Sequence, residues 1–169
     1  MDKKNGGLGL RSLEIMNDAL LGRVAWNIIS KPRNLCSQVL VEKYGRKHDL
    51  LKECKAMKAD SEVWKSMARI LPKIVQNIFW EVGNGEKVWF WQDKWIEGGR
   101  KLCDMFVGLL TEDEGRLKVK EICANGGWDM AKIGNNLNDE GRDILLAVLP
   151  PSNQNCEDEV RWGTRLQNR

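Results

Sequence analysis

The sequence predicts a mainly helical protein that carries one β-hairpin, at about residues 79–92. Apolar residues recur at three- and four-residue steps over residues 12–29 and 61–77, which is typical of helices with one buried face. Asn84-Gly85 stands between aromatic stretches, and such a pair is the strongest short-range signal of a hairpin. With 169 residues, 42% of them hydrophobic, the chain can form one ordinary domain or two small ones.

The first two helices are expected at residues 12–29 and 34–44. Their apolar residues recur at helical steps, so we expect these side chains to face inward. They are Leu13, Met16, Leu20, Val24 and Ile28 in the first helix, with Leu21, Ala25 and Ile29 widening the stripe, and Leu35, Val39 and Leu40 in the second. Pro32 ends the first helix, because the residue before a proline avoids helical backbone angles. Gly45 ends the second.

The third helix is expected at residues 61–77, after a polar, lysine-rich loop. Its inward face is predicted to contain Val63, Trp64, Met67, Ile70, Leu71 and Ile74. Pro72 lies inside this span and lacks the backbone N–H that a helix needs. We therefore predict a kink or a break at Pro72.

The segment from Trp80 to Trp95 holds four of the eight tryptophans of the chain. If Asn84 and Gly85 form a two-residue turn, Trp80 faces Trp89 across the ribbon. A two-stranded ribbon is marginally stable alone, so these rings must pack on helices or on a partner. Residues 1–98 are thus expected to form a helical connecting region with a Trp-rich hairpin.

Residues 99–169 give a weaker pattern. We expect a less ordered segment with two short helices, at residues 128–137 and 139–149. Gly126-Gly127 precedes the first, and Pro150-Pro151 stops the second. The fold of this last third is the least determined by the sequence.

The net charge of +3 is unevenly distributed along the chain. Residues 1–101 hold 19 Lys and Arg against 12 Asp and Glu, whereas residues 102–169 hold 8 against 12. The basic part could contact nucleic acid, and the acidic part could not readily do so. Two solvated surfaces of uneven charge are the alternative, since no tight cluster of Lys and Arg appears.

The five cysteines are far apart and include no Cys-x-x-Cys pair. The pattern predicts reduced, mostly buried thiols, no metal site and no other cofactor. No apolar run approaches the roughly 18 residues of a membrane span, and residues 1–10 lack the apolar core of a secretory signal. We therefore expect an intracellular protein, in the nucleus or the cytoplasm, without a membrane partner and not secreted.

Catalytic motifs are not evident in the sequence. It has no GxxxxGK[ST] phosphate loop, no GxSxG elbow and no carboxylate motif that would hold two metal ions. The single histidine, His48, lies in a lysine-rich stretch with no evident nucleophile beside it. We therefore expect no enzymatic activity from this chain.

Three sequence blocks carry a resemblance to a known family: KKNGGLGLRSLEIMNDALLGRVAWNI at 3–28, SEVWKSM at 61–67, and FWEVGNGEKVWFWQDKWIEG at 79–98. Weaker blocks follow at 126–137 and 144–162. Together they resemble the plant LINE-type (non-LTR) retroelement polyproteins, named reverse transcriptase-like or ribonuclease H proteins. The resembled region lies between the reverse transcriptase domain and the zinc-binding and ribonuclease H domains.

The resemblance implies a non-catalytic, truncated fragment of an RNA-directed DNA polymerase polyprotein. The family's Tyr-Ala-Asp-Asp turn has no counterpart here, and its zinc ligands and ribonuclease H carboxylates would lie beyond residue 169. The implied role is a structural connector whose partners are the polymerase and downstream domains, with RNA or DNA contact. The alternatives are a stand-alone single-stranded nucleic-acid-binding module and a non-functional remnant of a decayed element.

Aromatic side chains beside Lys or Arg are typical of surfaces that bind RNA or DNA. Such rings stack on unpaired bases while the cations neutralise phosphates. The candidate residues on the hairpin are Lys87, Trp89, Trp91, Lys94 and Trp95, and the candidate backbone contacts are Lys3, Lys4 and Arg11. Alternatively, the tryptophans anchor the hairpin to the helices and form part of the core.

Overall fold

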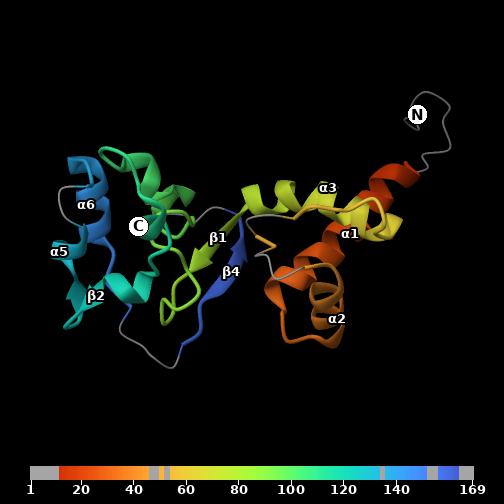
Figure 1. Cartoon of the computed structure of the whole chain (residues 1–169), viewed down its shortest axis with the longest axis horizontal. Coiled ribbons are helices and arrows are strands. Elements are labelled where there is room, and N and C mark those ends of the chain that lie inside the picture. The colour runs from red at the N-terminus through yellow and green to blue at the C-terminus, as the bar shows by residue number, and fades with distance from the viewer. Residues whose placement is uncertain (1–11, 46–49, 52–53, 134–135, 152–155, 164–169) are drawn as a thin grey trace, which may run out of the picture. The chain divides into compact units, whose positions relative to one another are not determined.

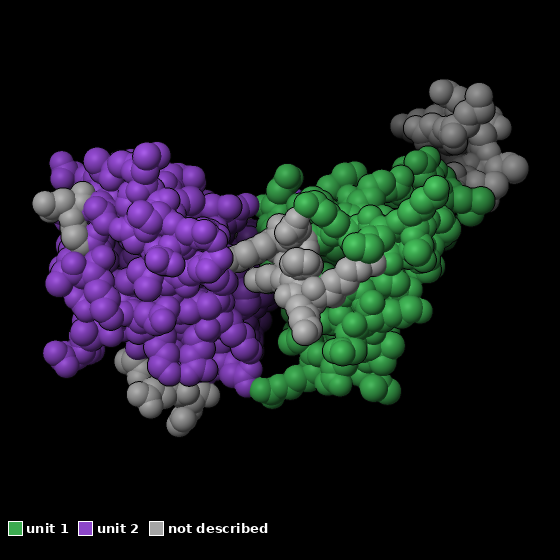
Figure 2. Space-filling model, viewed as in Figure 1, with its two compact units in different colours: residues 1–76 green, residues 77–169 purple. Residues whose placement is uncertain are grey.

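The structure is a computed structural model that describes residues 12–45, 50–51, 54–133, 136–151 and 156–163 (Figure 1). The chain divides into two compact units, Met1–Gln76 and Asn77–Arg169 (Figure 2). The predicted division after residue 98 differs from this one, because the Trp-rich segment packs within the second unit.

The first unit contains the three helices that the sequence predicts. They are α1 (Leu13–Ser30), α2 (Leu35–Tyr44) and α3 (Glu62–Gln76). Their bounds agree with the predicted ones to within the usual uncertainty of helix ends. The helix α3 continues through Pro72, so a break there is not observed. Leu71 and Ile74 are buried on either side of Pro72, and this packing favours an unbroken helix.

The core of the first unit forms around Ile28, Tyr44, Trp64 and Met67. The rings of Tyr44 and Trp64 stack, with centroids 4.7 Å apart and an interplanar angle of 12°. The hydroxyl of Tyr44 lies 3.0 Å from that of Ser61. The face predicted for α3 is therefore correct, except that Val63 is exposed.

The faces predicted for α1 and α2 are correct only in part: Leu21 and Leu40 pack against the core as predicted, but other predicted residues are exposed. In α1, the predicted residues Ala25 and Ile28 are buried, whereas Leu13 and Leu20 are exposed, Leu20 at 62% of its surface. In α2, Leu35 is 76% exposed and Val39 is also exposed, whereas Ser37 and Tyr44 are buried. The physical reason is that apolar residues lie all around both helices, so periodicity alone cannot select the face that packs.

The second unit combines short helices with short strands. Its strands are β1 (Ile78–Glu81), β2 (Cys123–Ala124), β3 (Gly127–Trp128) and β4 (Glu159–Trp162). Its helices are η2 (Glu97–Gly99), η3 (Leu102–Met105), α4 (Glu112–Gly115), η4 (Val119–Ile122), α5 (Met130–Ile133) and α6 (Asp139–Ala147). The mainly helical class with a small hairpin is confirmed.

The position predicted for the hairpin, about 79–92, is wrong. Strand β1 pairs antiparallel with β4, from Ile78 opposite Trp162 to Glu81 opposite Glu159. Residues 88–90 instead pair with residues 117–119: the N–H of Phe90 donates to the carbonyl of Leu117 (2.9 Å), and that of Val119 to the carbonyl of Val88 (3.0 Å). Trp80 and Trp89 therefore do not face each other across one ribbon.

The hairpin that the structure contains joins β2 to β3 through Asn125-Gly126. Both residues have positive φ, 52° and 78°, as a type I′ turn requires. At the pair that the prediction used, only Gly85 has positive φ, 72°. An Asn-Gly pair therefore does form a tight hairpin turn in this chain, but at Asn125-Gly126 instead of Asn84-Gly85.

The core of the second unit is built around the Trp-rich segment. Phe90, Trp91, Trp95 and Ile96 are buried there against η3, η4, α5 and α6. The segment expected to be less ordered supplies much of this core. The buried residues that it contributes are Leu102, Met105, Val119, Ile122, Ile133, Leu137 and Leu145.

No disulfide joins the five cysteines, all of which lie in described ranges. Cys36 and Cys156 are exposed and the other three are half-buried, so the expectation of mostly buried thiols is wrong. None of the helices in the described ranges combines the length and the apolar content that a membrane span requires.

Candidate interaction surfaces

Two of the predicted stacking residues, Trp91 and Trp95, lie in the core at 1% exposure each. The indole N–H of Trp95 donates to the carbonyl of Phe90 at 2.8 Å. The ring of Phe90 meets that of Trp91 edge-on, with centroids 4.8 Å apart. Neither indole is accessible to a nucleic-acid base, so the packing alternative describes both residues.

Trp89 is the one hairpin tryptophan of the predicted set that keeps a partly exposed ring. The ammonium of Lys118 lies 4.0 Å from its centroid, within the range of a cation–π contact. The same ammonium donates to the carbonyl of Lys87 at 2.9 Å. The ring and the Lys118 cation thus form one small platform on the second unit.

Carboxylates compensate the lysines near this platform. Lys87 pairs with Glu157 at 2.9 Å, and Lys120 pairs with Glu86 at 2.6 Å. Lys94 is half-buried. The structure therefore provides a weaker cationic surface around Trp89 than the sequence suggested. The other predicted contacts, Lys3, Lys4 and Arg11, lie outside the described residues.

Most of the basic excess belongs to the first unit, which holds 15 Lys and Arg against 8 Asp and Glu. On α3, Lys65, Arg69 and Lys73 follow one another at four-residue steps, so they share one side of the helix. Lys65 pairs with Glu62 at 2.7 Å, and Arg69 with Asp18 at 3.3 Å. This stripe is cationic and partly neutralised.

The exposed apolar side chains of α1 form a second surface on the first unit. Leu13, Met16, Leu20 and Val24 fall on one side of the helix and are all exposed. A contiguous apolar stripe of this kind is uncommon on the free surface of a monomer. We refer to these four residues as the α1 stripe.

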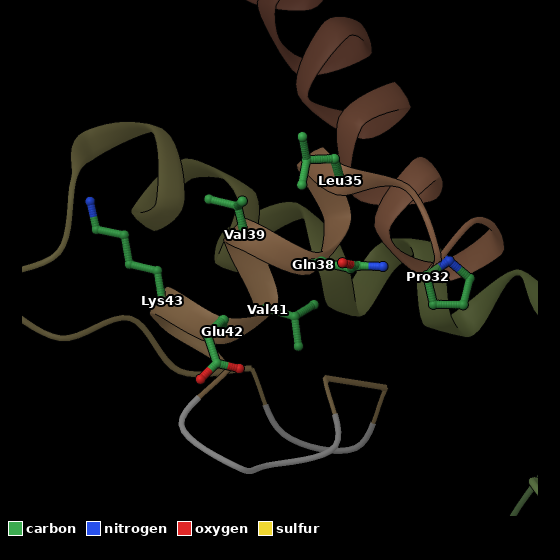
Figure 3. A pocket seen from close by; sticks show the side chains of 7 residues that line it. All are labelled: Pro32, Leu35, Gln38, Val39, Val41, Glu42 and Lys43. Carbon is green, nitrogen blue, oxygen red and sulfur yellow. The ribbon is translucent and has the colours of Figure 1, made fainter.

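The outer face of α2 carries an open groove. Its lining residues are Pro32, Leu35, Gln38, Val39, Val41, Glu42 and Lys43. Figure 3 shows Leu35, Val39 and Val41 projecting from the helix. Apolar grooves lined by helix side chains are suited to a partner helix or another extended apolar segment. The groove and the α1 stripe are therefore two apolar surfaces in the described part of the first unit.

The Gly83–Lys87 loop surrounds the carboxylate of Asp158, which is 4% exposed. One oxygen accepts from the backbone N–H groups of Gly83 (2.7 Å) and Gly85 (2.8 Å), and the other from that of Lys87 (2.8 Å). We refer to this arrangement as the Asp158 clasp. It satisfies a buried charge entirely with fixed backbone donors.

The two glycines of the loop are required by the close approach of other backbone atoms. A Cβ on Gly83 would lie 2.3 Å from the carbonyl oxygen of Cys156. A Cβ on Gly85 would lie 2.7 Å from the amide nitrogen of Lys120, at a φ of 72°. The Gly-Asn-Gly sequence therefore makes room for the clasp instead of a tight hairpin.

Sequence reasoning missed Asp158, because its three donors lie more than 70 residues away in the chain. The usable signal was the pairing of two sequence blocks, Gly-Asn-Gly at 83–85 and Glu-Asp-Glu at 157–159.

Chemically reactive groups are sparse in the described parts of the chain. Among those residues, no three His, Cys, Asp or Glu side chains are placed to hold a metal ion. Burial raises the pKa of the Cys103 and Cys123 thiols. Both thiols therefore remain protonated and weakly nucleophilic at neutral pH.

Two proteins of Arabidopsis thaliana are similar to this chain. One, named putative ribonuclease H protein, is 31% identical over 163 residues, which cover 95% of the chain and 26% of that protein. The other, named uncharacterized mitochondrial protein, is 32% identical over 92 residues, which cover 54% of the chain and 59% of that protein. The chain thus spans about a quarter of the first and less than two thirds of the second. No family model and no solved structure matches the chain.

Proposed function

We propose that this chain is a non-catalytic connecting segment of a retroelement polyprotein of the LINE type, placed between a reverse transcriptase domain and a ribonuclease H domain. Its similarity to a protein named ribonuclease H, over nearly its whole length but only a quarter of that protein, supports this proposal. The sequence blocks that resemble the family support the position of the segment.

The α1 stripe is the observation that carries the connector role. A helix with apolar residues on all sides is typically covered on all sides in the assembled protein. In the first unit, α2 and α3 both contact α1, whose buried residues are Ala25 and Ile28, and the α1 stripe stays exposed. The proposed role of the α1 stripe and the α2 groove is to pack against a neighbouring domain of the longer protein.

Cysteine labelling can test this role. Leu20→Cys should react with a maleimide in the present chain and be protected in a longer protein that joins the chain to the flanking regions of its Arabidopsis relative. Leu109→Cys in the second unit is the matched control, since Leu109 is exposed and lies outside both apolar surfaces. Peptide-level mass spectrometry separates these sites from Cys36 and Cys156. Equal labelling of Leu20→Cys in both proteins would reject the proposed packing.

Contact with RNA or DNA is the second candidate function. The basic excess of the first unit and the Trp89–Lys118 platform of the second favour it. Stacking on one such ring contributes roughly 1–3 kcal/mol per base. The carboxylates that pair with Lys87 and Lys120 weaken the attraction.

Tryptophan fluorescence during titration with single-stranded RNA, at two salt concentrations, tests this candidate. Binding should quench the fluorescence, and the affinity should decrease as the salt concentration rises. The affinity should also decrease in the Trp89→Ala variant, but not in the Trp162→Ala variant. A folded chain that gives no response at low salt would remove nucleic-acid contact from the proposed function.

A further inference from the structure

The segment of residues 157–162 is held in the second unit in the way that a separate peptide would be held. Its backbone pairs along β1, and the side chain of Asp158 enters the Asp158 clasp. Ion pairs join Glu157 to Lys87 at 2.9 Å and Arg161 to Glu81 at 2.7 Å. Backbone pairing with a few specific side-chain contacts is how proteins bind extended peptides at a sheet edge.

The surface that receives this segment has its own supports. The N–H of Trp80 donates to the carbonyl of Lys94 at 2.7 Å, which holds β1 from its other edge. The N–H of Lys120 donates to the carbonyl of Gly85 at 3.0 Å, and the Lys120 ammonium pairs with Glu86. These contacts hold β1 and the Gly83–Lys87 loop in place independently of residues 157–162.

We infer that β1 and the Gly83–Lys87 loop form a receptor for an extended acidic strand, and that residues 157–162 of a second copy of the chain can fill it. The occupant supplies a carboxylate to three backbone N–H groups, a preceding carboxylate to Lys87, and a strand to β1. Copies that exchange this segment make the same contacts between chains as within one chain, so the exchange loses no interaction.

The tethered segment has a large advantage over a free one. A short tether gives it an effective concentration on the order of millimolar. A second copy therefore competes only near that concentration, unless the resident segment is weakened. Asp158→Asn weakens it, because an amide presents N–H groups where the clasp needs an acceptor.

The test uses a fluorescein-labelled peptide of residues 156–163 and the full chain. By anisotropy, the peptide should bind the Asp158→Asn chain at least about tenfold more tightly than the wild-type chain, because the resident segment no longer competes. The control peptide carries the same Asp158→Asn change and should bind the variant chain at least about tenfold more weakly than the wild-type peptide. Equal binding of the two peptides, or no binding to a folded variant, would overturn the inference.

Near-UV circular dichroism shows whether the variant is folded. If it is not, hydrogen exchange on the wild-type chain decides the question. Excess wild-type peptide should speed exchange of the chain's own β4 amides while the N–H groups of Gly83, Gly85 and Lys87 stay protected, since a new carboxylate occupies the clasp. Unchanged exchange in β4 at peptide concentrations well above the effective concentration would overturn the receptor role.

Discussion

The two units of this chain differ in where their most prominent aromatic and apolar side chains lie. The second unit buries its aromatic segment, so that Trp91 and Trp95 lie in a core shared with η3 and α6. The first unit leaves the α1 stripe and the α2 groove exposed. The difference shows that the second unit is organised around a buried aromatic core, whereas the first keeps apolar side chains of two helices in contact with solvent.

In the second unit, residues distant in the sequence are joined by strand pairing, and the described residues of the first unit contain no such pairing. The Asp158 clasp and the β1–β4 pairing fix residues 156–163 to the start of the unit. Two distant sequence blocks thereby form one feature, and this explains why the glycines at 83 and 85 accompany the acidic residues near the other end.

The largest effect on stability is expected when a buried aromatic ring is removed from the core of the second unit. Trp95→Ala should lower the free energy of unfolding by about 3–5 kcal/mol, since a buried indole is replaced by a cavity and the carbonyl of Phe90 loses its donor. Trp162→Ala is the matched control, because Trp162 is mostly exposed on β4. Urea unfolding measures both. A loss below about 1 kcal/mol for Trp95→Ala would mean that the Trp-rich core does not hold the unit together.

A change of intermediate size in stability should distinguish Gly85 from Gly126, the glycines of two of the Asn-Gly pairs. Gly85→Ala forces a Cβ to 2.7 Å from a backbone nitrogen at positive φ, so we expect a loss of about 2–4 kcal/mol. Gly126→Ala also has positive φ but meets no atom within 4 Å, and its expected loss is about 1 kcal/mol. Thermal unfolding of the two variants compares them directly. Equal losses would show that the close approach at Gly85 is not what requires glycine.

The sequence predicted local structure well in this protein. The three helices of the first unit, the apolar face of α3 and the short helix α6 follow from patterns within one segment. Features decided by distant partners were not predictable in this way. The partner of β1 is β4, and Asp158 reaches Gly83 across 75 residues.

The candidate site shows the same limit. Clustered tryptophans beside lysines suggested an exposed stacking surface, but rings that are large and apolar are equally suited to a core. Trp91 and Trp95 became core, and Trp89 stayed partly exposed. The even distribution of apolar residues around α1 was visible in the sequence. Such a distribution does not determine which face of a helix is buried.

The smallest effect on stability is expected for a substitution in the exposed α1 stripe of the first unit. Leu20→Gln should change the free energy of unfolding by less than about 0.5 kcal/mol, because the side chain is already mostly in water. The same change should raise solubility, since it interrupts the α1 stripe. Unfolding curves and the concentration at which the chain begins to associate, measured by light scattering, check both expectations. A loss above about 1 kcal/mol would place Leu20 in the core of the first unit. The α1 stripe would then not be an exposed surface available to a neighbouring domain.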